Sequence, residues 1–195
     1  MTLQQQFGNT DIYLFDQLLR GNIRPGMKIF DAGCGGGRNI FYFLREGYDV
    51  YACDKEPEAV MYVQGLSQAP EQIRCEPLEE MSFPSSFADV VISCAVLHFA
   101  EDDTEFAGML SASWRVLTPG GLFFCRLATS IGIEKQMEPA GENRYHLPDG
   151  STRYLANEKM LLEWTRRLGG SLVDPLKTTV VQGQRAMTTW VLQKH

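Results

Sequence analysis

The stretch KIFDAGCGGGRNI, from Lys28 to Ile40, constrains the fold of this 195-residue chain more than any other. An apolar strand pattern ends there at Asp31, four glycines follow between positions 33 and 37, and a helical pattern begins. Glycine is costly inside regular structure, so such a run indicates a sharp backbone turn or a ligand lying against the backbone. The stretch therefore predicts a strand, a tight turn and a helix in immediate succession.

Strands and helices alternate along the rest of the chain. Strands are expected over residues 28–31, 49–54, 72–75, 88–94 and 122–128. Helices are expected over residues 11–20, 41–44, 56–66 and 102–117. The last third predicts a helix over 159–168 and strands near 172–181 and 186–193. This alternation favours a parallel sheet with helices on both sides, and such sheets bind ligands beyond the carboxyl ends of their strands.

Composition excludes several classes of protein. The net charge is −6, from 18 basic and 24 acidic residues, and no basic stripe appears, so nucleic acid is not an expected partner. We find no apolar run long enough to cross a bilayer and no secretory signal, so we expect a cytoplasmic protein that does not bind membranes. The odd number of cysteines and the lack of a CxxC pair suit reduced thiols rather than disulfides or zinc; they are Cys34, Cys53, Cys75, Cys94 and Cys125.

The glycine run also predicts the kind of ligand. Gly33 suits a tight turn and Gly35 suits a close approach of ligand to backbone. Asp54 ends the second strand about 20 residues later, the spacing of an acid that binds a ribose diol. Together these features indicate a cofactor that contains adenosine.

Two residues distinguish between adenosine cofactors. A dinucleotide fingerprint that starts at Gly33 requires glycine at position 38, where the chain has Arg38. Asp31, just before the glycines, would repel a pyrophosphate but attract an ammonium group. S-adenosylmethionine (SAM) carries both an adenosine and a cationic amino-acid end, so it fits better than NAD(P).

The motifs DAGCGGG, FADVVISCAVLHF and SWRVLTPGGLFFC resemble, in order and spacing, those of the class I SAM-dependent methyltransferases. The resemblance covers residues 28–128. It implies an α/β fold, a three-layer αβα sandwich around a seven-stranded, mostly parallel sheet in the order 3-2-1-4-5-7-6, with the last strand antiparallel. It also implies one Rossmann-like methyltransferase domain over residues 1–195.

The resemblance carries cofactor roles over to individual residues. Asp31 would face the methionine ammonium, and Asp54 would hold the ribose hydroxyls. The other expected contacts, to methionine, sugar and adenine, are Gly33, Cys34, Gly35, Lys55, Leu78, Cys94 and Ala95. The acid that contacts the adenine amino group stays open, because Pro77 stands where the family places it, with Glu76 one residue away and Glu79 two. S-adenosylhomocysteine (SAH) would be the product.

Methyl transfer from a sulfonium is an in-line displacement that depends chiefly on holding the acceptor in place. A base is required only when the acceptor starts protonated, and His98, just past the fourth strand, is the candidate. A backbone-bonding role for His98 is the alternative. The end of the fourth strand offers no cluster of oxygen ligands, so we expect no metal.

Two segments are expected to enclose the acceptor. Residues 1–26 would form an N-terminal helical cap that brings Phe7 and Tyr13 near the sulfonium. Residues 131–155 would form an inserted hairpin that turns at Asp149-Gly150 and acts as a lid. In the predicted register Tyr145 pairs with Tyr154, while His146 and Arg153 lie on the other face. A solvent-facing arm is the alternative for this hairpin.

The sequence thus predicts a metal-independent SAM methyltransferase that acts on a small or medium-sized molecule, as a monomer or weak homodimer. A SAM-binding module or partner subunit without activity is an alternative. An NAD(P)-binding oxidoreductase is a second alternative, against which Asp31 and Arg38 both count.

Overall fold

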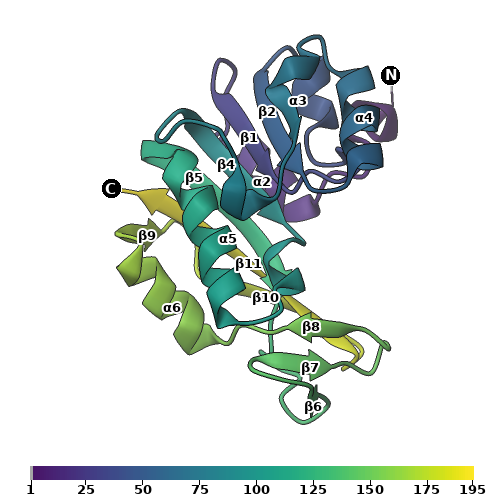
Figure 1. The fold of residues 1–195 in the computed structure, drawn as a ribbon, viewed down its shortest axis with the longest axis vertical. Helices are drawn as coiled ribbons and strands as arrows, with labels where there is room; N and C mark the ends of the chain where they lie inside the picture. Colours follow the sequence, from purple (N-terminus) through teal and green to yellow (C-terminus); the bar gives the residue numbers. More distant parts are fainter. Residues whose placement is uncertain (1) are drawn as a thin grey trace.

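The computed structural model describes residues 2–195 and contains a central twisted sheet with helices on both faces (Figure 1). The sheet runs in the order β10-β11-β5-β4-β1-β2-β3, and β9 also pairs with β11. Its strands are β1 (Lys28–Ala32), β2 (Asp49–Asp54), β3 (Ile73–Cys75), β4 (Ala88–Cys94), β5 (Leu117–Ala128), β9 (Gly170–Leu172), β10 (Lys177–Val181) and β11 (Arg185–Lys194). Strands β1 to β5 are mutually parallel, and β11 runs antiparallel to its neighbours. The expected three-layer fold is confirmed.

The expected number of seven strands is wrong, because the sheet has eight. The segment expected as one sixth strand is split into β9 and β10, which share one edge of β11. Pro175 lies in the break. Proline has no backbone N–H to donate, so it interrupts a strand of this kind. Along the main path the order is that of the predicted 3-2-1-4-5-7-6 sheet, with β10 and β11 as the last two strands.

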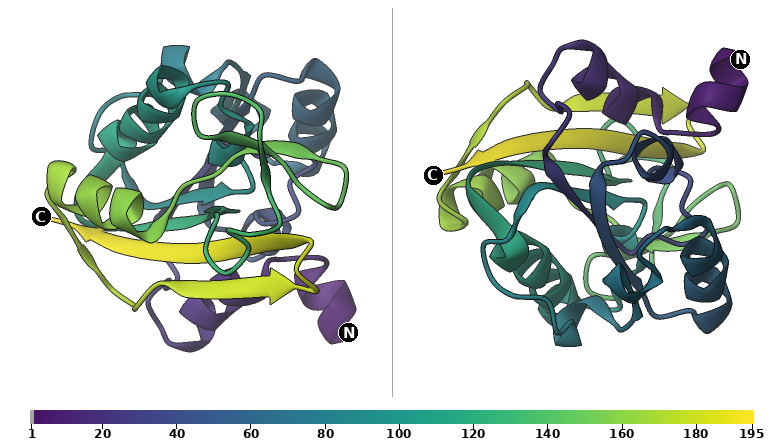
Figure 2. Two further views of the ribbon diagram at one scale, coloured as in Figure 1. Left: turned by 90° about the horizontal axis from the view of Figure 1, so that it is seen from below. Right: turned by 90° about the horizontal axis from the view of Figure 1, so that it is seen from above.

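Each face of the sheet carries its own apolar core. Helices α2 (Ile12–Leu19), α3 (Phe41–Arg45) and α4 (Pro57–Leu66) cover one face, where Leu14 and Phe43 pack against Ile29. Helices α5 (Asp103–Val116) and α6 (Glu158–Arg167) cover the other, where Phe106 packs with Phe30. Successive strand residues thus enter opposite cores, as the two-residue period of a strand requires. Figure 2 shows the sheet from its edge, with helices on either side of it.

Short elements complete the structure. They are helix α1 (Leu3–Phe7), the 3-10 turns η1 (Pro70–Gln72), η2 (Leu78–Glu80) and η3 (Leu97–Phe99), and strands β6 (Glu138–Pro139), β7 (Arg144–His146) and β8 (Thr152–Tyr154). Strands β6, β7 and β8 form a separate small sheet beside the end of β5 (Figure 1).

The predicted register of the hairpin is wrong by one residue. Tyr145 pairs with Arg153, and Arg144 pairs with Tyr154. The cause is the side chain of Asp149, which accepts hydrogen bonds from the N–H and hydroxyl of Ser151. The N–H of Leu147 then donates to the carbonyl of Ser151, which leaves a three-residue loop instead of the expected two-residue turn.

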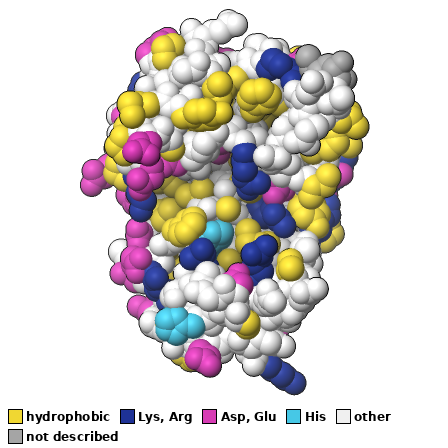
Figure 3. Space-filling view, turned by 90° about the vertical axis from the view of Figure 1, so that its right-hand side faces the viewer, with side chains coloured by type: hydrophobic (Ala, Val, Ile, Leu, Met, Phe, Trp, Pro, Cys, Tyr) yellow, Lys and Arg dark blue, Asp and Glu magenta, His cyan; other side chains and the backbone are white. Residues whose placement is uncertain are grey.

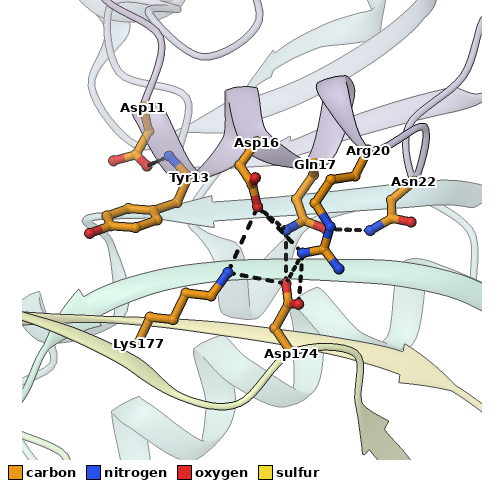
Figure 4. A network of polar contacts seen from close by, with 8 residues as sticks. All are labelled: Asp11, Tyr13, Asp16, Gln17, Arg20, Asn22, Asp174 and Lys177. Carbon is orange, nitrogen blue, oxygen red and sulfur yellow. Dashed lines mark hydrogen bonds and ion pairs between the residues drawn. The ribbon is translucent and has the colours of Figure 1, made fainter.

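Helix α2 is fixed at its C-terminal end by a polar network (Figure 4). Arg20 binds both carboxylate oxygens of Asp174, at 2.7 and 2.8 Å, and Gln17 donates to the same carboxylate at 3.0 Å. Lys177, on β10, lies 3.8 Å from Asp16 and 3.7 Å from Asp174. Both bonds come from Nη1 of Arg20, and these charge-assisted contacts together with the bond from Gln17 hold α2 beside Asp174.

Candidate functional site

A cavity of about 720 Å³ opens at the carboxyl ends of β1, β2 and β4. Its wall comes from the glycine loop, the β2–α4 turn, η2, the segment after β4 and the first turns of α5. The space-filling view of this side shows a hollow with hydrophobic and basic side chains around it (Figure 3). The lining residues are Gly33, Cys34, Gly35, Gly36, Arg38, Asn39, Asp54, Lys55, Glu56, Ala59, Glu76, Pro77, Leu78, Glu79, Cys94, Ala95, Val96, Phe99, Glu101, Glu105 and Met109.

Gly33 begins the turn at the base of this cavity. Its φ is +82°, and a Cβ added there would lie 2.7 Å from Cγ2 of Val96. The N–H groups of Gly33 and Cys34 both donate to the carbonyl of Cys53 at 3.0 Å. Position 33 thus requires glycine for two reasons, which are its backbone conformation and the close approach of the segment after β4.

The carboxylate of Asp54 joins two segments of the wall. Its Oδ2 accepts the N–H of Gly35 at 2.7 Å, and its Oδ1 accepts the N–H of Glu56 at 3.0 Å. Two backbone donors hold the carboxylate in one orientation at the cavity surface. The predicted ribose-binding residue therefore lies at the cavity surface, against the glycine loop.

Asp31 lies beneath the loop and does not itself line the cavity. It is 2% exposed, and burial raises the pKa of its carboxyl to about 7. The charge of Arg38 opposes that rise in pKa, whereas the charge of Asp54 adds to it. A cation entering the cavity would favour the ionised form of Asp31.

The opposite end of the cavity is formed by the end of β4. Ala95 adopts a left-handed conformation with φ +63°, and its N–H donates to the carbonyl of Arg126 at 2.7 Å. The Cys94 thiol receives a hydrogen bond from Nη2 of Arg38 at 3.2 Å. Burial raises the pKa of this thiol to about 12, so it is a neutral group at physiological pH and a poor nucleophile.

His98 lies in η3 and is 6% exposed. Its Nδ1 accepts the N–H of Ala128 at 3.0 Å, so the proton of the neutral ring is on Nε2. Burial, and then the charge of Arg153, lowers the pKa of the ring to about 4. In this state His98 offers a hydrogen-bond donor at Nε2 rather than a free base, which favours the backbone-bonding interpretation.

Leu78 and Lys55 line the cavity on the side of η2. Glu76, one candidate for the adenine-contacting acid, already accepts the N–H and hydroxyl of Ser82 at 2.8 and 2.6 Å. Glu79 also lines this wall. The adenine contact therefore stays open between these acids and the backbone of η2.

The N-terminal residues expected near the acceptor do not line the cavity. Phe7 stacks on Tyr42 of α3, with ring centroids 4.8 Å apart. The hydroxyl of Tyr13 lies 2.8 Å from that of Thr179, and its ring packs against the guanidinium of Arg126. Both aromatic rings thus fix the cap to the body of the protein.

The four hairpin residues expected near the acceptor lie in different surroundings, because the observed register differs from the predicted one. Tyr154 is 1% exposed, stacks on Phe106 and donates its hydroxyl to Asp103 at 2.7 Å. Tyr145 packs in a small cluster around Ile133, and His146 is exposed. Arg153 lies 4.8 Å from the ring centroid of Phe99, which lines the cavity. Of these four, Arg153 comes nearest to the predicted acceptor role.

One ion pair beside the site was missed from sequence. Asp11, at the start of α2, accepts a hydrogen bond from Arg126 at 2.8 Å, close to the Cys94 thiol. Arg126 interrupts the otherwise apolar strand pattern LFFCRLA, and a buried charge requires a partner. That signal predicts an ion pair at the end of β5 without identifying Asp11.

Across residues 2–195, no three His, Cys, Asp or Glu side chains gather where they would hold a metal ion. Over the same residues, every helix is too short or too polar to traverse a lipid bilayer.

Comparison with known proteins finds methyltransferases. Residues 30–125 match the model of the methyltransferase domain family. An uncharacterized methyltransferase of Synechocystis sp. is 31% identical over 111 residues, which are 52% of this chain and 47% of that protein. The chain spans between 41% and 61% of the length of the curated relatives it matches.

Solved structures share the fold. The PH0226 protein of Pyrococcus horikoshii OT3 superposes with a TM-score of 0.73 at 15% identity, over 94% of this chain and 89% of that one. The 1,6-didemethyltoxoflavin-N1-methyltransferase of Burkholderia thailandensis, solved with 1,6-didemethyltoxoflavin and SAH, gives 0.71 at 19% identity, over 98% and 80%. The family match, the sheet order and the glycine loop together show that residues 30–125 belong to the methyltransferase domain family.

Proposed function

We propose that this protein transfers the methyl group of SAM to a small or medium-sized acceptor without a metal ion. The observation that carries the proposal is the hydrogen bond between Asp54 and Gly35, which holds the carboxylate proposed to bind the ribose against a glycine loop in the wall of one cavity. A cavity of about 720 Å³ is within the range of small-molecule sites, roughly 300–1,000 Å³.

The residues present fit this cofactor. Nothing lies within 4 Å of a Cβ built on Gly35 or Gly36, so the backbone of the loop there is open to a ligand. Asp54 would accept hydrogen bonds from the ribose, and Leu78 would pack against the adenine. Cys94 and Ala95 would contact the methionine portion, with the charge of Asp31 beneath it. When bound, SAM supplies an electrophilic methyl group with a good leaving group.

The contribution of the protein to the reaction is then mainly positional. Holding an acceptor atom in line with the methyl group supplies much of the rate acceleration. Val96 and Phe99 line the cavity near Cys94, and the hairpin residue Arg153 lies against the ring of Phe99. We therefore propose that the hairpin over residues 131–155 encloses the acceptor.

Titration calorimetry with SAM and SAH tests the proposal. We expect one site per chain and no binding of NADH in a parallel fluorescence titration. Binding of NADH but not SAH would instead support the oxidoreductase alternative. Tight SAH binding without turnover on any acceptor in a broad panel would support a cofactor-binding module.

Metal independence has its own test. Turnover, once an acceptor is found, should persist in EDTA. Loss of turnover that magnesium restores would contradict the metal-independent mechanism.

A further inference from the structure

Arg153, on β8, is a cation beside the cavity that has no carboxylate partner in the structure of residues 2–195. Its guanidinium carbon lies 4.8 Å from the ring centroid of Phe99, and its Nη1 donates to the carbonyl of Thr152 at 2.8 Å. A guanidinium has five N–H donors, so most of those of Arg153 remain available to a ligand.

Two other arginines near this end of the site are neutralised within the protein. Arg126, on β5, is paired with Asp11 at 2.8 Å. Arg144, on β7, is paired with Glu101, which lines the cavity. Their positive charges are therefore already balanced, whereas that of Arg153 is not.

The ring of Phe99 connects Arg153 to the cavity. Phe99 lines the cavity wall and is 54% exposed, although its side chain is large and apolar. An aromatic ring attracts a guanidinium through its electrons and leaves N–H groups free for oxygen acceptors. The pair thus offers an apolar surface next to free donors, which is the combination that fixes the orientation of a small molecule in a binding site.

The charge of Arg153 also acts on His98, the residue before Phe99. The rings of His98 and Phe99 have centroids 4.7 Å apart. Burial lowers the pKa of His98, and the charge of Arg153 lowers it further. His98 is therefore neutral at physiological pH, and Arg153 supplies the positive charge beside this short segment.

We propose that the methyl acceptor carries an anionic oxygen group, a carboxylate or a phosphate, which Arg153 binds while the rest of the acceptor packs against Phe99. This inference rests on the proposed function, because it requires SAM and an acceptor in this cavity. The planar donors of a guanidinium match either group in two parallel hydrogen bonds. The sulfonium of SAM is also positive, so it would attract an anionic acceptor more strongly than a neutral one. Arg153 would act as a specificity-determining residue that orients the acceptor.

The test compares three probes that share one apolar ring system and differ in the group that Arg153 is proposed to bind. They are 2-naphthoate, 2-naphthyl phosphate and the neutral 2-naphthamide. Their affinities for the SAH-saturated protein are measured by titration with ligand-observed NMR in the wild type, Arg153→Gln, Arg153→Lys and Arg166→Gln. Arg166 lies exposed in the last turn of α6, outside the cavity wall, so its variant removes one positive charge elsewhere.

We expect the wild type to bind at least one of the two anions about tenfold more tightly than the amide, the scale of a charge-assisted hydrogen bond. The tighter of the two anions identifies the group that the acceptor carries. Arg153→Gln should lose this preference with its amide affinity unchanged, Arg153→Lys should retain part of it, and Arg166→Gln should retain all of it. Calorimetry should give each variant the SAH affinity of the wild type, which also shows that the variants are folded.

A wild-type protein that binds SAH but shows no preference for either anion over the amide would overturn the inference, and so would one that binds none of the three probes. A preference that persists in Arg153→Gln would also overturn it, because another residue would then bind the anion. A wild-type protein that does not bind SAH would instead overturn the proposed function, and the inference with it. The SAH titration therefore distinguishes the two failures.

Discussion

The carboxylate of Asp54 accepts the N–H of Gly35 at 2.7 Å, across 19 positions of sequence. The bond joins the end of β2 to the loop after β1, two strands that are neighbours in the sheet. It holds the carboxylate in place before any ligand arrives, so little conformational entropy remains to be lost on binding. This preorganisation leads directly to the first prediction.

Replacing Asp54 with alanine should weaken the binding of SAH and of 5′-methylthioadenosine alike, because both carry the ribose. The expected loss is about 1–3 kcal/mol, the cost of a lost or unpaired charged hydrogen bond. Asp54→Asn retains one oxygen acceptor and should lose less. Calorimetry on both ligands makes the measurement, and unchanged affinity in the alanine variant would remove the ribose assignment.

Asp31 makes stability depend on pH. Its folded pKa, about 7, lies above the ordinary value of 3.8 expected in the unfolded chain. A raised pKa means that the folded state binds the extra proton, so this stabilisation is complete below about pH 4 and is lost as the pH rises through 7.

Asp31→Asn cannot lose that proton. Its unfolding free energy should exceed that of the wild type by an amount that grows between pH 4 and pH 8, reaching roughly 2–4 kcal/mol. Urea unfolding of both proteins at pH 5 and pH 8 makes the comparison. A difference that is the same at both pH values would show that Asp31 has an ordinary pKa.

Gly33→Ala tests the close approach between the loop and Val96. The new Cβ would meet Cγ2 of Val96 at 2.7 Å, and φ at this position is +82°. We expect a destabilisation of about 2–4 kcal/mol from overpacking and backbone strain together.

Two further variants separate those causes. Adding Val96→Ala to Gly33→Ala removes the methyl groups that clash and should restore part of the loss, while the backbone strain remains. Gly36→Ala is the matched control, because nothing lies within 4 Å of its Cβ and its φ is not positive. It should change the unfolding free energy by less than about 0.5 kcal/mol. Equal losses at both glycines would show that the contact with Val96 is unimportant.

Features of this protein that depend on local sequence patterns were predicted, whereas features that depend on contacts between distant segments were not. The strand over 88–94 follows from its own apolar run. The juxtaposition of Asp54 with the glycine loop depends on neighbouring segments of one βαβ unit, where spacing and chain reach fix the outcome. The pairing of Asp11 with Arg126 joins residues 115 positions apart and depends on where α2 docks on the finished sheet. No periodicity in either segment carries that information.

The errors have side-chain causes of the same kind. The hairpin loop has three residues rather than two, and the hydrogen bonds from Ser151 to Asp149 that accompany it could not be predicted from the sequence pattern. A one-residue change of register moves every side chain of the strand to the other face. That slip is why Tyr154, expected at the cavity, lies in the core instead.

The hairpin therefore combines a structural residue with one near the site, and the last prediction separates them. Tyr154 is 1% exposed and stacks on Phe106 with ring centroids 4.7 Å apart, whereas Arg153 lies on Phe99 at the cavity wall. Deleting residues 145–154 would remove Tyr154 from the core, so it would destabilise the fold as well as open the cavity.

Single substitutions avoid that difficulty. Tyr154→Ala should lower the unfolding free energy by about 3–5 kcal/mol, the range for truncating a buried aromatic side chain. Arg153→Ala should lower it by less than about 1 kcal/mol and leave SAH affinity unchanged, because it touches the wall beyond the cofactor-binding residues. Once the acceptor is known, Arg153→Ala should reduce kcat/KM for methyl transfer. Full activity in a stable Arg153→Ala protein would show that this hairpin is a structural arm and that other residues position the acceptor.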